Sequence, residues 1–115
     1  TLLAASDALR AWVERRYPGA TWLREWPVRA RLAGPPPRLL VGEVDLALEL
    51  PDGFVLIDHK SFPGAAKERD RRVVEEYAPQ LRWYARALAD ALKKPMVAAF
   101  VHFPVRGEMA EVKLE

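Results

Sequence analysis

The chain has 115 residues, of which 50% are hydrophobic and 30% charged, and it carries a formal net charge of +2 with a pI near 9.1. These values indicate one globular domain with a modest core, and the weak positive charge permits nucleic-acid binding without requiring it. The absence of cysteine excludes disulfides and cysteine-ligated metal sites, and no apolar run approaches the roughly 20 residues of a membrane helix, so no membrane partner is expected.

The first third of the chain predicts a helix followed by a strand. Residues 3–16 fit an amphipathic helix that ends before a Pro-Gly pair. Residues 21–32 predict a strand in which Pro27 suits a sheet edge or a bulge. The proline-rich segment 34–37 predicts a stiff loop, because the chain is too short for a linker between two domains.

The middle of the chain predicts a β-hairpin. Residues 41–50 alternate between apolar and other side chains, and residues 54–60 are equally typical of a strand. Asp52-Gly53 suits a two-residue hairpin turn. With these two residues as the turn, Asp45 is expected to pair with Lys60.

In that register Asp58 lies one pair away from Asp45 and Lys60 on the same face of the hairpin. We expect the opposite face to be apolar and to pack against a core. Its predicted members are Val44, Leu46, Leu48, Leu50, Val55 and Ile57. A register shifted by one residue would scatter the charged trio.

The trio of Asp45, Asp58 and Lys60 predicts phosphoryl chemistry. Two carboxylates can hold Mg²⁺ or Mn²⁺ and leave room for water and a substrate phosphate. Such a metal polarises a phosphoryl oxygen and lowers the pKa of its water, while a lysine orients that water and stabilises negative charge. The alternative is a surface ion pair between Asp45 and Lys60, worth about 0–1 kcal/mol.

The last third of the chain predicts a helix and one or two strands. After a polar segment over 61–76, residues 78–93 predict a helix with a proline in its first turn. Residues 96–103 predict a buried strand, and residues 108–114 predict a further strand at the edge. The expected order is α-β-β-β-α-β with a possible extra strand, an α/β fold with a mixed central sheet flanked by helices.

Four segments, taken in chain order, resemble the PD-(D/E)XK nuclease superfamily. They are Arg24-Glu25-Trp26-Pro27-Val28, Gly42-Glu43-Val44-Asp45-Leu46, Asp52-Gly53 followed by Leu56-Ile57-Asp58-His59-Lys60-Ser61, and Tyr77-Ala78-Pro79-Gln80-Leu81-Arg82-Trp83-Tyr84-Ala85. Within the superfamily they resemble the RecB-like nuclease domain of bacterial helicase–nucleases, of the AddA type. The resemblance implies a restriction-endonuclease-like core within a single domain over residues 1–115.

The resemblance implies a role for each matching residue. Asp45 and Asp58 correspond to the two metal-binding acids, and Lys60 corresponds to the catalytic lysine. The main-chain carbonyl of His59 would be a further ligand of the Mg²⁺ or Mn²⁺ ion. Glu25 corresponds to a glutamate of the catalytic site that precedes the central hairpin.

On the following helix, Gln80 and Tyr84 match a glutamine–tyrosine pair that lies beside the metal and the DNA backbone. Their i,i+4 spacing places both on one face of the helix. The chain departs from the family in one respect: the metal-binding histidine of an upstream helix has no counterpart, since only His59 and His102 are present. That helix is therefore expected outside this fragment, which would leave the metal site incomplete.

The resemblance implies a Mg²⁺- or Mn²⁺-dependent deoxyribonuclease, an exonuclease domain that acts in DNA double-strand break repair and recombination. Expected partners are single-stranded DNA ends, a helicase domain of the same chain and a second helicase–nuclease subunit. Because the chain starts with Thr1 and not Met, we expect a processed protein or an excised piece of a longer one, and no secretory signal is seen. The resemblance implies a C-terminal fragment of a bacterial cytoplasmic, nucleoid-associated helicase–nuclease. Two alternatives remain: a catalytically incomplete DNA-binding or scaffolding module of the same fold, and a stand-alone restriction or junction-resolving nuclease.

Overall fold

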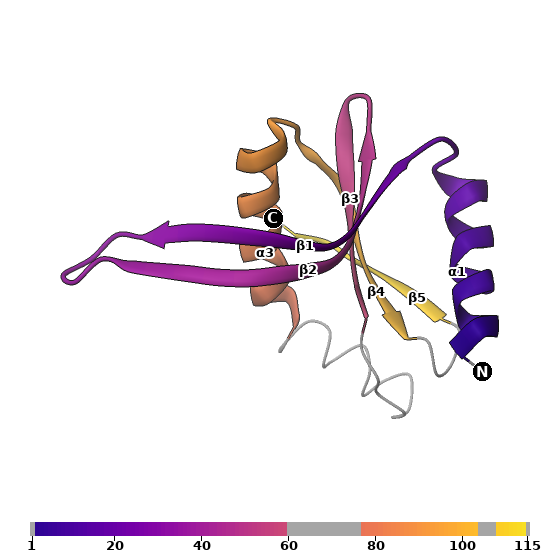
Figure 1. Cartoon of the computed structure of the whole chain (residues 1–115), viewed down its shortest axis with the longest axis horizontal. Helices are drawn as coiled ribbons and strands as arrows, with labels where there is room; N and C mark the ends of the chain where they lie inside the picture. The colour runs from indigo at the N-terminus through magenta and orange to yellow at the C-terminus, as the bar shows by residue number, and fades with distance from the viewer. Residues whose placement is uncertain (1, 60–76, 104–107, 115) are drawn as a thin grey trace.

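The strands of the central sheet lie side by side in their chain order. A computed structural model describes residues 2–59, 77–103 and 108–114. Its elements are α1 (Leu2–Arg16), β1 (Thr21–Leu32), β2 (Arg38–Leu50), β3 (Gly53–His59), α3 (Ala78–Leu92), β4 (Met96–Phe103) and β5 (Glu108–Val112). The sheet runs β1-β2-β3-β4-β5, with β3 parallel to β4 and the other neighbours antiparallel (Figure 1). The expected α/β fold and element order are confirmed, and the possible last strand is present.

Local sequence signals account for most element boundaries. Helix α1 ends before Pro18 and Gly19, and Gly19 has a φ of 78°, a conformation that glycine adopts without steric cost. Helix α3 ends at Lys93, whose φ is 58° and whose N–H donates to the carbonyl of Ala89. Neither helix in the described part of the chain has the length and apolar character needed to cross a membrane.

Both faces of the sheet are covered, which corrects the expected division into one apolar and one charged face. Helix α3 packs on one face and α1 on the other (Figure 1). The α1 cluster contains Leu9, Val13, Leu46, Leu48, Val55, Ile57, Ala98 and Phe100. The α3 cluster includes Ala47, Phe54 and Leu56 from the face that was expected to be charged. Strands that pair in parallel across a crossover helix are normally buried on both faces, and β3 follows this rule.

The hairpin register also differs from the expectation. Residues 51 and 52 form the turn, and Leu46 pairs with Ile57. Continuing that register by one residue places Asp45 opposite Asp58, whereas we expected Asp45 opposite Lys60, which lies outside the described residues. The difference is a shift of two positions, so the side chains from Leu46 to Ile57 keep the face that the alternation predicts. Val44 does not, because it was expected on the face of Leu46 and lies in the α3 cluster.

Gly53 explains the shifted turn. A Cβ at this position would lie 2.9 Å from the carbonyl oxygen of Pro95 and 2.6 Å from Cγ2 of Val97. The neighbouring Phe54 N–H donates to the same Pro95 oxygen over 3.0 Å. Among the described glycines, positive φ angles occur at Gly19 and Gly34 and not at Gly53. Gly53 therefore permits the close approach of the chain entering β4 and does not form the turn.

The β1–β2 ladder is interrupted at one position. Arg24 pairs with Leu46 and Trp26 with Val44, but the residues between them, Glu25 and Asp45, do not pair in the described ladder. Glu25 has a φ of 50°. Beyond this interruption both strands bend away from the sheet and continue as a two-stranded arm, formed by residues 26–32 and 38–44 (Figure 1).

The interruption changes which side of β2 faces helix α3. Val44 and Ala47 both belong to the α3 cluster, although residues three apart in a regular strand lie on opposite faces. At the root of the arm, a Cβ on Gly42 would lie 3.0 Å from Cε1 of Tyr84 and 3.3 Å from Cζ3 of Trp83. Gly42 therefore lets the arm lie directly against helix α3.

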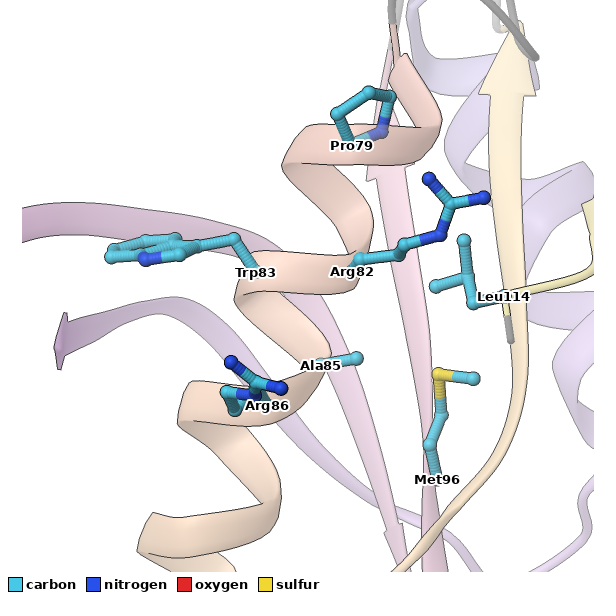
Figure 2. A pocket seen from close by; sticks show the side chains of 7 residues that line it. All are labelled: Pro79, Arg82, Trp83, Ala85, Arg86, Met96 and Leu114. Atoms are coloured by element: carbon cyan, nitrogen blue, oxygen red, sulfur yellow. The ribbon is translucent and has the colours of Figure 1, made fainter. Parts of the chain in front are cut away.

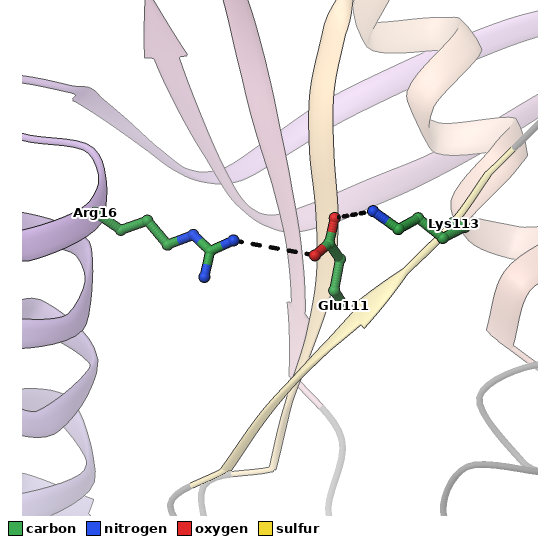
Figure 3. A network of polar contacts seen from close by, with 3 residues as sticks. All are labelled: Arg16, Glu111 and Lys113. Carbon is green, nitrogen blue, oxygen red and sulfur yellow. Dashed lines mark hydrogen bonds and ion pairs between the residues drawn. The ribbon is translucent and has the colours of Figure 1, made fainter.

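An exposed polar network joins α1 to the far edge of the sheet (Figure 3). Lys113 Nζ donates to Glu111 Oε2 over 2.7 Å, and Arg16 Nη2 lies 4.0 Å from Glu111 Oε1. The pKa of Glu111 is lowered, mainly because its carboxylate accepts this hydrogen bond from Lys113. Exposed pairs of this kind contribute little stability, so the attachment of α1 depends on its buried apolar side chains.

The contact at Gly53 generates a stability prediction. Gly53→Ala should lower the free energy of unfolding by about 1–3 kcal/mol, because the added methyl group must displace the main chain at Pro95. Urea unfolding followed by circular dichroism measures this loss. Asp52→Ala, at the neighbouring exposed turn residue, is the control and should stay within about 0.5 kcal/mol of the wild type. Equal stability of the two variants would contradict the assigned role of Gly53.

Candidate active site

Three predicted site acids come into register across neighbouring strands. Asp45 lies on β2 at the interrupted position, with Glu25 at the matching position of β1. On the other side, the β2–β3 pairing ends at Leu46 and Ile57, and one further step in that register would bring Asp45 opposite Asp58. The three acids therefore occur at matching positions of neighbouring strands, where β1 and β2 leave the sheet. Their catalytic roles stay predictions.

Asp45 is fixed by a hydrogen bond to the neighbouring strand. Its Oδ2 accepts from the main-chain N–H of His59 over 2.8 Å, and this N–H belongs to the peptide that joins Asp58 to His59. A side-chain carboxylate thus bonds to β3 where the regular ladder between β2 and β3 has ended. Charge-assisted hydrogen bonds of this type are short and strong, so the carboxylate of Asp45 is held beside Asp58.

Asp58 is buried, with 4% of its surface exposed, at the end of the otherwise apolar strand β3. Burying a carboxylate costs several kcal/mol in general unless its charge is compensated. Buried ionisable groups of this kind are found mainly at functional sites, where the charge takes part in binding or catalysis. The burial therefore supports a specific function for Asp58 over a solvated surface role.

Glu25 is exposed and has the left-handed φ of 50° given above. A non-glycine residue in this region carries a strain of roughly 1 kcal/mol or more, and such residues cluster at functional sites. The local sequence gave no sign of this conformation, because Glu25 lies inside a regular strand pattern.

The donor set suits a hard divalent cation. Among the described residues, no group of three or more histidine, cysteine or acidic side chains is gathered around one point. Two carboxylates, those of Asp45 and Asp58, together with the carbonyl of His59, still fit Mg²⁺ or Mn²⁺, because Mg²⁺ commonly keeps several waters and binds through one or two carboxylates. Lys60, the predicted catalytic lysine, lies outside the described residues.

Gln80 and Tyr84 contact each other on helix α3, as their spacing predicted. Gln80 Nε2 donates to the Tyr84 hydroxyl over 3.2 Å, with Tyr84 buried and Gln80 exposed. The Tyr84 ring packs against Gly42, three residues before Asp45. Gly42 is part of a sequence motif, but its contact with Tyr84 and Trp83 could not be predicted from the sequence. That contact forms only because the arm packs against helix α3.

The two histidines form a pair that the sequence did not predict. His59 Nδ1 and His102 Nδ1 lie 2.9 Å apart on the parallel strands β3 and β4. Burial lowers the pKa of His59, with Asp45 opposing this effect and Arg24 adding to it. Burial, together with the nearby His59, lowers the pKa of His102 to about 4. The His59 side chain is therefore a neutral packing group that directs its main chain toward Asp45.

One hollow of the described surface is lined by other residues. It has a volume of about 480 Å³ and opens along helix α3 (Figure 2). Its lining residues are Pro79, Arg82, Trp83, Ala85, Arg86, Met96 and Leu114. None of the predicted catalytic residues belongs to it, so the chemistry of the carboxylates and not the size of a cavity identifies the candidate site.

Comparison with known proteins gives a consistent result. A family model described as the PD-(D/E)XK nuclease superfamily matches residues 2–114. Two similar proteins, from Pediococcus pentosaceus and Desulforamulus reducens, both carry the name of the A-type subunit of an ATP-dependent helicase/nuclease. The first is 28% identical over 78 residues, or 65% of this chain, and the second is 34% identical over 77 residues, or 64%. The matched region spans about 6% of each relative. These similarities agree with the resemblance to the AddA type.

The histidine pair generates a pH prediction. Below its ordinary pKa of 6.5, His102 takes up a proton in the unfolded chain but stays neutral in the folded protein down to about pH 4. The free energy of unfolding should therefore fall by roughly 1–2 kcal/mol between pH 7 and pH 5. Urea titrations across this range measure the loss. His102→Asn removes the titrating group and should flatten the profile, whereas a profile as steep as that of the wild type would contradict the assignment.

Proposed function

Because the chain belongs to the PD-(D/E)XK nuclease superfamily, we propose that it is a metal-dependent nuclease domain that hydrolyses phosphodiester bonds in DNA. The observation that carries the proposal is the hydrogen bond that joins Asp45 on β2 to the peptide after the buried Asp58 on β3. Two carboxylates on neighbouring strands of a largely apolar sheet are costly to bury, and a bound cation would offset this cost.

In this proposal Asp45, Asp58 and the carbonyl of His59 hold a Mg²⁺ or Mn²⁺ ion. When bound, the ion supplies Lewis-acid polarisation of the phosphate and lowers the pKa of water. The His59 N–H fixes the orientation of the Asp45 carboxylate, so the ligands are arranged before substrate binds. The mutual repulsion of the two acids favours a cation at this position.

Lys60 completes the proposed chemistry. Its ammonium orients the attacking water and stabilises the negative charge that develops on the phosphate. We assign Glu25 to the same site because it lies in register with Asp45 and holds a strained main-chain conformation. Gln80 and Tyr84 would support the DNA backbone from helix α3, since their side chains are already joined.

The names of the two relatives support a finer proposal. Both relatives are named as the A-type subunit of an ATP-dependent helicase/nuclease, so we place this domain in a helicase–nuclease with a helicase part in the same chain and a second helicase–nuclease subunit. The proposed substrate is single-stranded DNA ends, cleaved as by an exonuclease during double-strand break repair and recombination. The proposed setting is the bacterial cytoplasm, at the nucleoid.

One observation favours a second candidate function. The described residues contain no group of three or more histidine, cysteine or acidic side chains that could hold a metal ion. A catalytically incomplete module of the same fold would retain DNA binding and a scaffolding function without cleavage. The two candidates differ in one measurable property, the release of nucleotides in the presence of a divalent metal.

The acid pair generates the test of catalysis. The full-length protein should cleave single-stranded DNA with Mg²⁺ or Mn²⁺ and stop when EDTA removes the metal. Asp58→Asn preserves the volume of the buried side chain but removes its charge, and should reduce cleavage at least roughly a hundredfold. Asp52→Asn, an exposed acid in the turn before β3, is the matched control and should cleave like the wild type.

Cleavage rates of labelled oligonucleotides, with unfolding curves to verify the fold, provide the measurement. Undiminished cleavage by the Asp58→Asn variant would exclude Asp58 from the site. Metal-independent cleavage would exclude the proposed mechanism, and DNA binding without any cleavage by the wild type would favour the scaffolding module.

The Gln80–Tyr84 contact generates a second test. Tyr84→Phe removes the hydroxyl that accepts from Gln80 but keeps the ring against Gly42. Cleavage should slow by up to roughly tenfold with little change in stability, because one hydrogen bond near the substrate is lost. Tyr17→Phe, beside helix α1 on the other face of the sheet, is the control. Equal rates for the two variants would remove Tyr84 from the proposed site.

A further inference from the structure

The two-stranded arm carries a surface that the proposed chemistry does not use. Cross-strand pairs join Arg29 to Val41 and Arg31 to Leu39. Directly opposite residues of an antiparallel pair share a face, and so do residues two apart. These four side chains therefore form one continuous surface, which we call the arm face.

The arm face points away from the body of the protein. Val28 and Gly42, each one residue from the arm face along its strand, face helix α3: Val28 is in the α3 cluster and Gly42 lies against Tyr84. Alternation then turns Arg29 and Val41 to the opposite side. The exposed fractions agree, because Val41 is 65% and Leu39 55% exposed.

An arm of this kind needs a partner for its outer half. A two-stranded ribbon is marginally stable by itself in water, and an exposed aliphatic pair adds an unfavourable contact with solvent. Among the arm side chains that the structure describes, those packed on the α3 side are at the root and include Val28, Gly42 and Val44. Among the described residues no third strand pairs with the arm. The exposed Leu39 and Val41 thus remain available for a ligand.

The charge of the arm selects the kind of ligand. Residues 26–44 contain three arginines, Arg29, Arg31 and Arg38, and one acidic residue, Glu43, so the arm carries a net positive charge. Arginines two apart on a strand lie about 6.6 Å from each other, comparable to successive phosphates of an extended nucleic-acid strand. Aliphatic side chains between them suit the sugars and base faces of the same strand. A single-stranded polyanion with apolar groups matches both features of the arm face.

The position of the arm connects it to the candidate active site. The arm begins at the interrupted pair of Glu25 and Asp45, so the arm face starts on the same two strands that carry these acids (Figure 1). We propose that the arm face is a guide for single-stranded DNA, in which Arg29 and Arg31 bind phosphates and Leu39 and Val41 contact sugars or bases. This inference rests on the proposed nuclease function and extends it by assigning residues that position the substrate.

The test compares two double variants of the full-length protein with equal loss of charge. Arg29→Ala with Arg31→Ala removes the arginines of the arm face, and Arg10→Ala with Arg15→Ala removes two exposed arginines of helix α1. Binding to a fluorescent oligonucleotide of about 30 nucleotides is measured by anisotropy in EDTA, which prevents cleavage. The arm variant should bind roughly tenfold more weakly, and the slope of log K against log salt should fall by about 1.4, since two phosphate contacts are lost.

The apolar half of the arm face has a different signature. Leu39→Ser with Val41→Ser should weaken binding severalfold without changing the salt slope, because no phosphate contact is removed. Cleavage of a short oligonucleotide of about four nucleotides, which reaches the acids but not the outer arm, should stay at the wild-type rate in both arm variants. These readouts separate lost contacts from a general loss of structure.

The following outcomes would contradict the proposal. An arm variant with wild-type affinity and salt slope, or an equal loss in the α1 variant, would show that the arm face does not bind the strand. Unchanged DNA binding together with weakened attachment of the helicase part would reassign the arm to an acidic protein surface. If the wild type cleaves oligonucleotides and the arm variants bind DNA with wild-type affinity, only this inference is refuted. If the wild type does not cleave, the proposed nuclease function is refuted.

Discussion

The hydrogen bond from the His59 main-chain N–H to the Asp45 carboxylate is the interaction on which the arrangement of the candidate site depends. It occurs where β2 has stopped pairing with β3 and where β1 and β2 skip one pair. A side chain thus takes over a bond that the main chain would otherwise make. The buried N–H is satisfied, and the carboxylate is brought to the peptide beside Asp58.

The same position decides how the rest of the chain is arranged. Because β2 changes its facing there, Val44 and Ala47 both reach helix α3, and the two strands leave the sheet as an arm. The arm lies close to α3 because Gly42 has no side chain to oppose Tyr84 and Trp83. One interruption of a ladder therefore links the acids, the glutamine–tyrosine helix and the projecting surface.

Burial determines which side chains of the candidate site carry charge. Asp58 lies at the end of a strand that is apolar on both faces, and the adjacent histidine pair is kept neutral by burial. Neutral histidines add no positive charge beside the carboxylates. The region similar to the two helicase/nuclease subunits spans about 6% of their length.

The sequence by itself determined the order of elements, their boundaries to within a few residues, and the family. It also determined the alternation of faces between Leu46 and Ile57, because a period of two is unchanged when a register shifts by two positions. Gln80 and Tyr84 were predictable for a similar reason, since i,i+4 spacing on a helix is a local property. These features depend only on neighbours along the chain.

Tertiary structure alone decided which residues pair. Gly53 reads as a turn residue in sequence, but the chain entering β4 approaches it so closely that no side chain fits, and this moves the turn to residues 51 and 52. The pairing of Leu46 with Ile57 then leads toward Asp45 opposite Asp58, whereas the sequence predicted Asp45 opposite Lys60, a residue outside the described part of the chain. The covering of both sheet faces, the histidine pair and the strained Glu25 likewise arise from contacts between segments far apart in the chain, which local periodicity does not encode.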